Sequence, residues 1–170
     1  MKIEKIISIL RTSAKKYQEN LENKNFLIIY EGDEQLEYIE VKFSGENFLH
    51  LTGVQLEKGK SKKLFYYKCL NGKISKNEIK IKTDGTTKLK LNILEMMTNI
   101  SKTARMIGKY NNWGDKLYTE FIIGTNYMSI GFIKVKDRFY VPNTALNKNI
   151  KEITEKTYHI IAICSKKINA

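Results

Sequence analysis

The sequence predicts an α+β fold, with N-terminal and central helices packed on a small antiparallel β-sheet. Apolar residues recur at helical spacing in residues 3–21 and again from Thr87 to about Gly108, which indicates two long helices. The last third of the chain instead holds short segments rich in β-branched and aromatic residues, separated by Gly, Asn and Asp-Arg turns. Helices early in the chain and strands late in it are typical of the α+β class.

The chain begins with an amphipathic helix. Its apolar residues are one, three or four positions apart and share one helical face: Ile3, Ile6, Ile7, Leu10, Ala14, Tyr17 and Leu21. The polar run NKN at 23–25 ends this helix. Two extended runs follow at 26–32 and 36–43, and GDEQ at their junction is typical of a turn, so we expect a β-hairpin.

The segment FLHLTGV at 48–54 holds one of the two histidines of the chain. Its alternation predicts an extended segment with Phe48, His50 and Thr52 on one face, so that His50 and Thr52 could point together into a cleft. The alternative is a half-buried core histidine that donates to a backbone carbonyl.

A lysine-rich loop at 56–63 leads into a short helix through KKLFYYKCL, which Ser61 can cap and Asn71 and Gly72 can end. The helix would gather Lys63, Tyr66, Tyr67 and Lys68 into a cluster suited to a phosphate and a stacked base; the alternative is solvated lysines opposite a core-facing side. The next segment could be a helix or a strand: SKNE has capping-box spacing, which favours a helix, whereas EIKIKTDG alternates as a strand does.

Four antiparallel strands are expected in the last third, at 117–124, 127–135, 138–143 and 157–165. Within YVPNTALNKNI, Pro142 and Asn143 signal a turn, and Thr144 can cap a following helical stretch, whose free amides could bind a phosphate. Trp113, just before these strands, is either a base-stacking platform or a plug over the sheet.

The length of 170 residues fits a single α+β domain at 1–170, without linkers or repeats. The formal net charge of +12 favours an anionic partner, with nucleic acid as the first candidate. Lysine supplies 27 of the 30 basic residues, so part of this charge could instead reflect compositional drift on a solvated surface.

Several classes of protein are excluded. Cys69 and Cys164 form no CxxC pair and have no histidine at metal-ligand spacing, so neither a disulfide framework nor a zinc site is expected. No apolar run is long enough for a membrane span and no signal peptide fits, so we expect a cytoplasmic protein without membrane contact. Phosphate-loop, dinucleotide, zincin and serine-hydrolase motifs and paired acidic residues are lacking, so no metal or cofactor is expected and any phosphodiester cleavage should be metal-independent.

The segments FLHLTGV, FYYKCLNGKIS, FIIGTNYMSIGFIKV and RFYVPNTALNKNI, in this order, resemble a phage-associated family grouped with the barnase, EndoU, colicin and RelE-like nucleases. The resemblance covers a nuclease-like core at about 20–165, preceded by the N-terminal amphipathic helix. It implies a compact RelE/barnase-like α+β fold and a metal-independent ribonuclease of prophages or conjugative elements.

The resemblance points first to His50 and Thr52, and less directly to Lys63, Tyr66, Thr144 and the strand around Ser129. Cleavage by the 2′-hydroxyl needs a base, an acid and cations near the phosphate. We expect His50, with Tyr66 and Thr52, to carry the catalysis. The expected phosphate or RNA ligands are Lys63, Lys68, Tyr67, Arg138, Asn143 and Thr144.

Two other functions remain open on the sequence. One is a non-catalytic basic protein of phage origin, such as an anti-CRISPR protein, that binds RNA or a host ribonucleoprotein. The other is a toxin that a cognate antitoxin or inhibitor protein holds silent.

Overall fold

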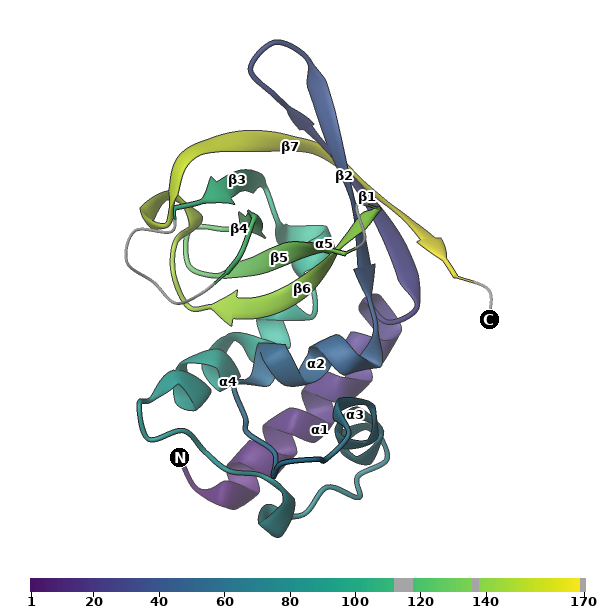
Figure 1. Ribbon diagram of the computed structural model, residues 1–170, viewed down its shortest axis with the longest axis vertical. Helices are drawn as coiled ribbons and strands as arrows, with labels where there is room; N and C mark the ends of the chain where they lie inside the picture. Colours follow the sequence, from purple (N-terminus) through teal and green to yellow (C-terminus); the bar gives the residue numbers. More distant parts are fainter. Residues whose placement is uncertain (112–117, 136–137, 169–170) are drawn as a thin grey trace.

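The computed structural model describes residues 1–111, 118–135 and 138–168. In Figure 1 a β-barrel lies at one end of the molecule and a group of helices at the other. The elements run in the order α1 (Ile3–Asn20), β1 (Lys24–Glu31), β2 (Leu36–Phe43), α2 (Gly45–Thr52), α3 (Lys62–Leu70), η1 (Lys76–Glu78), α4 (Thr86–Met97), α5 (Ile100–Thr103), β3 (Met106–Tyr110), β4 (Phe121–Gly124), β5 (Ser129–Val135), β6 (Phe139–Leu146), η2 (Ile150–Glu152) and β7 (Thr154–Lys167).

The expected small antiparallel sheet is wrong, although the mixed α+β class holds. The strands close into a barrel in the order β1-β2-β6-β5-β4-β3-β7, and β2 pairs with β6 in parallel through Val41 and Tyr140. Closure depends on the 14-residue strand β7, which pairs with β1 along one part and with β3 along another. Closing a sheet removes exposed strand edges, which a small open sheet would leave unpaired.

The long helix expected from Thr87 to Gly108 is also wrong beyond its first part. Helix α4 ends at Met97, the short α5 follows, and residues 106–110 form β3 between β4 and β7. Ala104 has extended backbone angles, which end the helical path. Since Ile107 is buried at a spacing that fits a helix as well as a strand, periodicity alone could not separate the two.

The segment at 48–54 is helical, which corrects the expected extended run. Ser44 begins α2 with a capping box, in which its backbone N–H donates to Oδ1 of Asn47 at 2.9 Å. In the helix Phe48 and Thr52 share the buried face, whereas His50 lies on the exposed side.

Other expectations are confirmed. The first helix, the β1–β2 hairpin and α3 form as predicted, and Oγ of Ser61 caps α3 by accepting from the backbone N–H of Leu64. The segment SKNE forms its capping box as a single 3₁₀ turn, followed by one isolated bridge from Lys80 to Gln55. Two expectations in the last third are wrong: the turn at Pro142 and Asn143, and the helical stretch after Thr144. Strand β6 continues through all three residues, with a β-bulge at Asn143.

The helices and the barrel share one hydrophobic core. Tyr17 of α1 meets Phe43 of β2 and Phe48 of α2 edge to face, at ring distances of 6.1 and 5.3 Å. Phe43 in turn meets Phe132 of β5 at 6.0 Å. This chain of rings fixes the helices against the barrel. Among the described helices, none combines the length and the apolar character that spanning a membrane requires.

Candidate functional site

A cleft of about 720 Å³ lies where helices α2 and α4, the loop after α2 and strand β6 meet. We call it the lysine cleft, since six of its lining residues are lysines. It is lined by Leu49, His50, Gly53, Val54, Gln55, Leu56, Glu57, Lys58, Lys60, Lys62, Lys80, Lys82, Lys90, Asn143 and Thr144. With a single carboxylate, from Glu57, opposed to these ammonium groups, the cleft suits an anion.

The end of α2 forms one wall of the lysine cleft. Thr52 is buried, and its hydroxyl donates to the carbonyl of Leu49 and accepts from the N–H of Val54, so it serves the helix end rather than facing the cleft. Gly53 ends the helix with a φ of 68°, and a Cβ there would lie 2.9 Å from Cδ of Lys90. Glycine therefore lets the Lys90 stem pass close to the backbone.

Lys90 is the innermost cation of the cleft. Its Nζ donates to the backbone carbonyl of His50 at 3.0 Å and to Oγ1 of Thr144 at 2.9 Å. The carbonyl lies in the last turn of α2, where the helix dipole favours a positive charge. An ammonium group has three donors, and the contacts among the described residues use two of them. The third is available for a bound ligand.

Strand β6 forms the opposite wall through a β-bulge. Gly131 of β5 pairs with Thr144 and Phe132 pairs with Pro142, so Asn143 is the extra residue. In a regular strand, neighbours point to opposite faces, but here both Asn143 and Thr144 line the cleft. Pro142 is tolerated beside a bulge because it has no N–H for the ladder.

The cleft changes the protonation of two of its groups. Burial, and then the charge of Lys82, lower the pKa of Lys90 to about 8. Partial burial, followed by the charges of Lys62 and Lys90, lowers the pKa of His50 below its ordinary value. Near neutral pH the cleft therefore pairs a neutral imidazole with a mostly protonated amine, which are a proton acceptor and a proton donor.

Lys62 is in direct contact with that imidazole. Lys62 is the first residue of α3, and its Nζ lies 2.9 Å from Nε2 of His50. An ammonium group has no acceptor, so Nε2 must accept this hydrogen bond and the neutral ring carries its proton on Nδ1. An anion that attracts Lys62 would free Nε2 to accept a proton from a ligand.

Of the residues expected from sequence, His50, Asn143 and Thr144 line the lysine cleft together, and Tyr66 does not. Tyr66 is fully buried, and its hydroxyl donates to Oε2 of buried Glu22 at 2.8 Å. Burial raises the pKa of Tyr66, and the hydrogen bond to Glu22 raises it further. This pair holds α3 against the end of α1.

The remaining expected ligands lie outside the cleft. Lys68 forms an ion pair with Glu78, Lys63 is exposed on α3, and Tyr67 packs partly against the Tyr66 ring at 5.7 Å. Arg138 lines a separate hollow with Glu37 and Glu40. These four side chains therefore do not line the lysine cleft.

Three further residues raised by the sequence can be placed. Ser129 is buried and its hydroxyl donates to the carbonyl of Lys148, and His159 is exposed in β7. Trp113 lies outside the described residues. Within the described part of the chain, no group of three or more His, Cys, Asp or Glu residues is arranged to hold a metal ion.

Lys90 is the residue that the sequence patterns missed. Thr87, Leu91 and Leu94 are the buried face of α4, and Lys90, three positions after Thr87 and four before Leu94, lies on that inward side. A lysine within an inward stripe was the available signal, but it was hidden among 27 lysines. Lys62 was missed because the neighbouring Lys63 fitted the expected cluster equally well.

A cleft that gathers lysines, an imidazole and a hydroxyl between helices and a barrel is chemically suited to a phosphate-bearing ligand. Residues 9–170 match the family model described as phage-Barnase-EndoU-ColicinE5/D-RelE like nuclease4, and the chain belongs to this family. The suspected family is thereby confirmed, and the match includes most of α1. The protein is thus a member of a phage-associated nuclease family. Among curated proteins and among solved structures, none matches the chain.

Proposed function

We propose that the protein is a metal-independent endoribonuclease of a mobile genetic element, which cleaves RNA by attack of the 2′-hydroxyl on the adjacent phosphate. The observation that carries the proposal is the position of Lys90, whose Nζ contacts both the His50 carbonyl and the Thr144 hydroxyl inside the lysine cleft. A scissile phosphate in this cleft would meet a base, an acid and several cations at once.

His50 suits the role of base. Its lowered pKa keeps the imidazole neutral at pH 7, and Nε2, once released by Lys62, can accept the 2′-hydroxyl proton. Because Lys62 then lies beside the base, its ammonium can contact a nonbridging phosphate oxygen.

Lys90 suits the role of acid. With a pKa of about 8, its ammonium can protonate the leaving 5′-oxygen through the third N–H, while the His50 carbonyl and Thr144 hold the group in position. The Thr144 hydroxyl accepts from Lys90 and can donate its own hydrogen to a phosphate oxygen. The products are a 2′,3′-cyclic phosphate and a 5′-hydroxyl end.

The proposal is tested by incubating the purified protein with labelled RNA in EDTA. Cleavage with new 5′-hydroxyl ends is expected, and a 2′-deoxy substitution at the cleaved nucleotide should abolish it, since the nucleophile is then missing. A shifted but intact RNA band would overturn the enzymatic proposal in favour of a binding protein.

Two pairs of variants assign the roles. His50→Ala should reduce cleavage by about 10²–10⁴-fold, whereas His159→Ala, at the exposed histidine of β7, should leave cleavage unchanged. Lys90→Met should reduce cleavage by a similar factor, and Lys88→Met, on the exposed side of the same helix, should leave cleavage unchanged. Retained cleavage in His50→Ala would remove this imidazole from the mechanism. A cognate inhibitor protein remains a prediction, and growth arrest on expression, relieved by His50→Ala, would support one.

A further inference from the structure

We propose that Tyr118 is the stacking platform for a nucleobase next to the phosphate bound in the lysine cleft, so that the substrate is RNA with unpaired bases. The identity of the ligand, RNA, rests on the proposed function. The contact between the ring and a base rests on the position of Tyr118.

Asn143 connects Tyr118 to the cleft. Its Nδ2 donates to the backbone carbonyl of Tyr118 at 2.6 Å, and its Oδ1 accepts from the hydroxyl of Thr119 at 3.0 Å. Both ends of the Asn143 amide are therefore engaged by residues 118–119, although its side chain lines the cleft. Asn143 is a positioning residue that holds this segment at the cleft wall, which differs from the phosphate-binding role expected from sequence.

Thr119 fixes the same segment from the other side. A Cβ on Gly131 would lie 2.7 Å from Cγ2 of Thr119 and 2.8 Å from Cγ2 of Thr144, so the two threonines pack over this glycine. Thr119 is buried, and Thr144 accepts the hydrogen bond of Lys90. Tyr118 is thus the neighbour in sequence of a residue that packs over the same glycine as Thr144.

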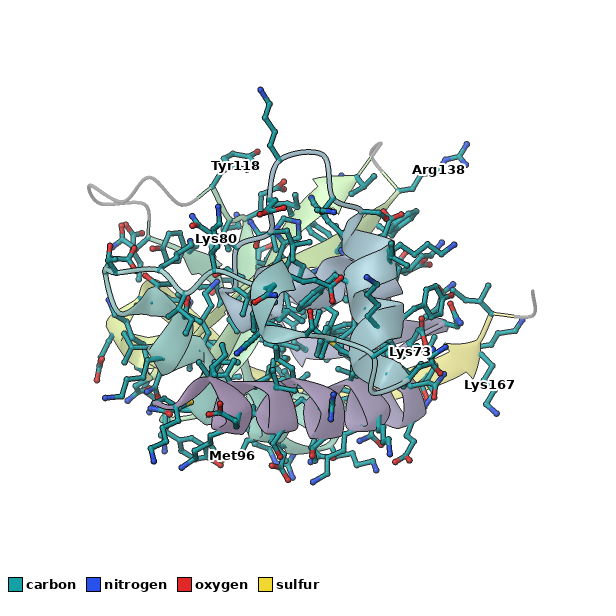
Figure 2. The ribbon with its side chains drawn as sticks, turned by 90° about the horizontal axis from the view of Figure 1, so that it is seen from below. Lys73, Lys80, Met96, Tyr118, Arg138 and Lys167 are labelled. Carbon is teal, nitrogen blue, oxygen red and sulfur yellow. The ribbon has the colours of Figure 1, made fainter. Side chains whose placement is uncertain are left out.

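The ring of Tyr118 is left for solvent. Tyr118 is 70% exposed, more than any other large apolar or aromatic residue in the described part of the chain. In Figure 2 Tyr118 lies at the upper edge of the molecule, and Lys80, a cleft lysine, lies in the same upper part of the view. An aromatic ring beside a cationic groove is the arrangement that binds single-stranded nucleic acid, because every base offers a face for stacking.

The test uses binding of uncleavable probes, which does not depend on catalysis. The probes are a fluorescent 2′-O-methyl oligouridylate and the same backbone with abasic positions, titrated at constant salt. Tyr118→Ala should weaken binding of the base-bearing probe about tenfold or more, leave the abasic probe unchanged, and be rescued by Tyr118→Trp. Tyr127→Ala is the matched control, since Tyr127 is also exposed but follows β4 where Tyr118 precedes it.

Equal binding of the base-bearing probe by Tyr118→Ala and the wild type would overturn the inference. So would an equal loss for both probes, which would indicate a general effect on the cleft, or a wild type that binds neither. If the Tyr118 effect is present but ordinary RNA stays uncut, the proposed ribonuclease activity fails alone and the stacking site stands.

Discussion

The Nζ atom of Lys90 lies 2.9 Å from Oγ1 of Thr144, and this contact joins helix α4 to strand β6 between the helical layer and the barrel. Its second acceptor is the carbonyl of His50 at the end of α2. One ammonium group therefore links three elements that are distant in sequence, at the point where the candidate base and the candidate phosphate ligands meet.

The folded protein should gain stability as Lys90 loses its proton. Burial lowers the pKa of Lys90 from 10.5 to about 8, so between these values the unfolded chain binds more protons than the folded one and the free energy of unfolding rises with pH. The wild type should therefore gain at most about 3 kcal/mol relative to Lys90→Met from pH 7.5 to 10.5. Urea unfolding at both pH values measures this, and Lys88→Met should run parallel to the wild type.

Cleavage should depend on pH through both groups. Activity should fall in acid as His50 is protonated, with a midpoint below the ordinary histidine pKa, and fall in alkali near the Lys90 pKa of about 8. Lys90→Arg keeps the proton to far higher pH and should move the alkaline limb of kcat/KM upward. An alkaline limb that does not move would contradict the acid role of Lys90.

Removing Lys62 should raise the pKa of His50. Partial burial lowers this pKa first and the Lys62 charge next, so Lys62→Met removes the second cause and leaves the first. With only two histidines in the chain, the imidazole proton signals can be followed by NMR during a pH titration. The pKa of His50 should move up. In the wild type, added inorganic phosphate should also raise the pKa of His50.

Tyr66→Phe separates a structural from a catalytic tyrosine. The change removes the donor to buried Glu22 and should destabilise the fold by about 1–3 kcal/mol, because a buried acceptor is left without a partner. Cleavage per folded molecule should be unchanged, since Tyr66 does not line the cleft. Urea unfolding measures the loss of stability, and kcat is measured at a temperature at which the variant stays folded. A large fall in kcat would indicate a catalytic role for Tyr66.

Lysines of the cleft should account for the salt dependence of RNA binding. Each phosphate contact on a single strand contributes about −0.7 to the slope of log K against log salt. Lys80→Met should therefore make the slope shallower by about this amount for an uncleavable RNA. Lys73, which Figure 2 shows on another part of the surface, supplies the control, and Lys73→Met should leave the slope unchanged.

Local signals in the sequence predicted the elements that local contacts define. The first helix, the hairpin and the Ser61-capped helix depend on nearby residues, and these predictions are confirmed. Barrel closure could not be predicted in this way, because Val41 pairs with Tyr140 and Leu27 with Cys164 across most of the chain. Residues 106–110 became β3 for the same reason, since their partners lie in β4 and β7.

The site was predicted in part for a related reason. The residue type identifies His50, whereas the alternation around it predicts an extended element; the capping box of Ser44 and Asn47 is the sequence signal for the helix. Asn143 and Thr144 were identified at a supposed turn, and the bulge beside Pro142 now explains how both line the cleft. The roles of Lys90 and Tyr118 depend on contacts with residues distant in sequence, which residue spacing does not predict.

The bulged strand β6 has a consequence for the synthesis of the protein. It supplies Thr144, and the strand that closes the barrel follows it along the chain. A polypeptide still attached to the ribosome, with these strands inside the exit tunnel, lacks the second wall of the cleft. The cleft of the proposed ribonuclease therefore forms only after β6 has left the tunnel, which delays any action on the messenger that encodes it.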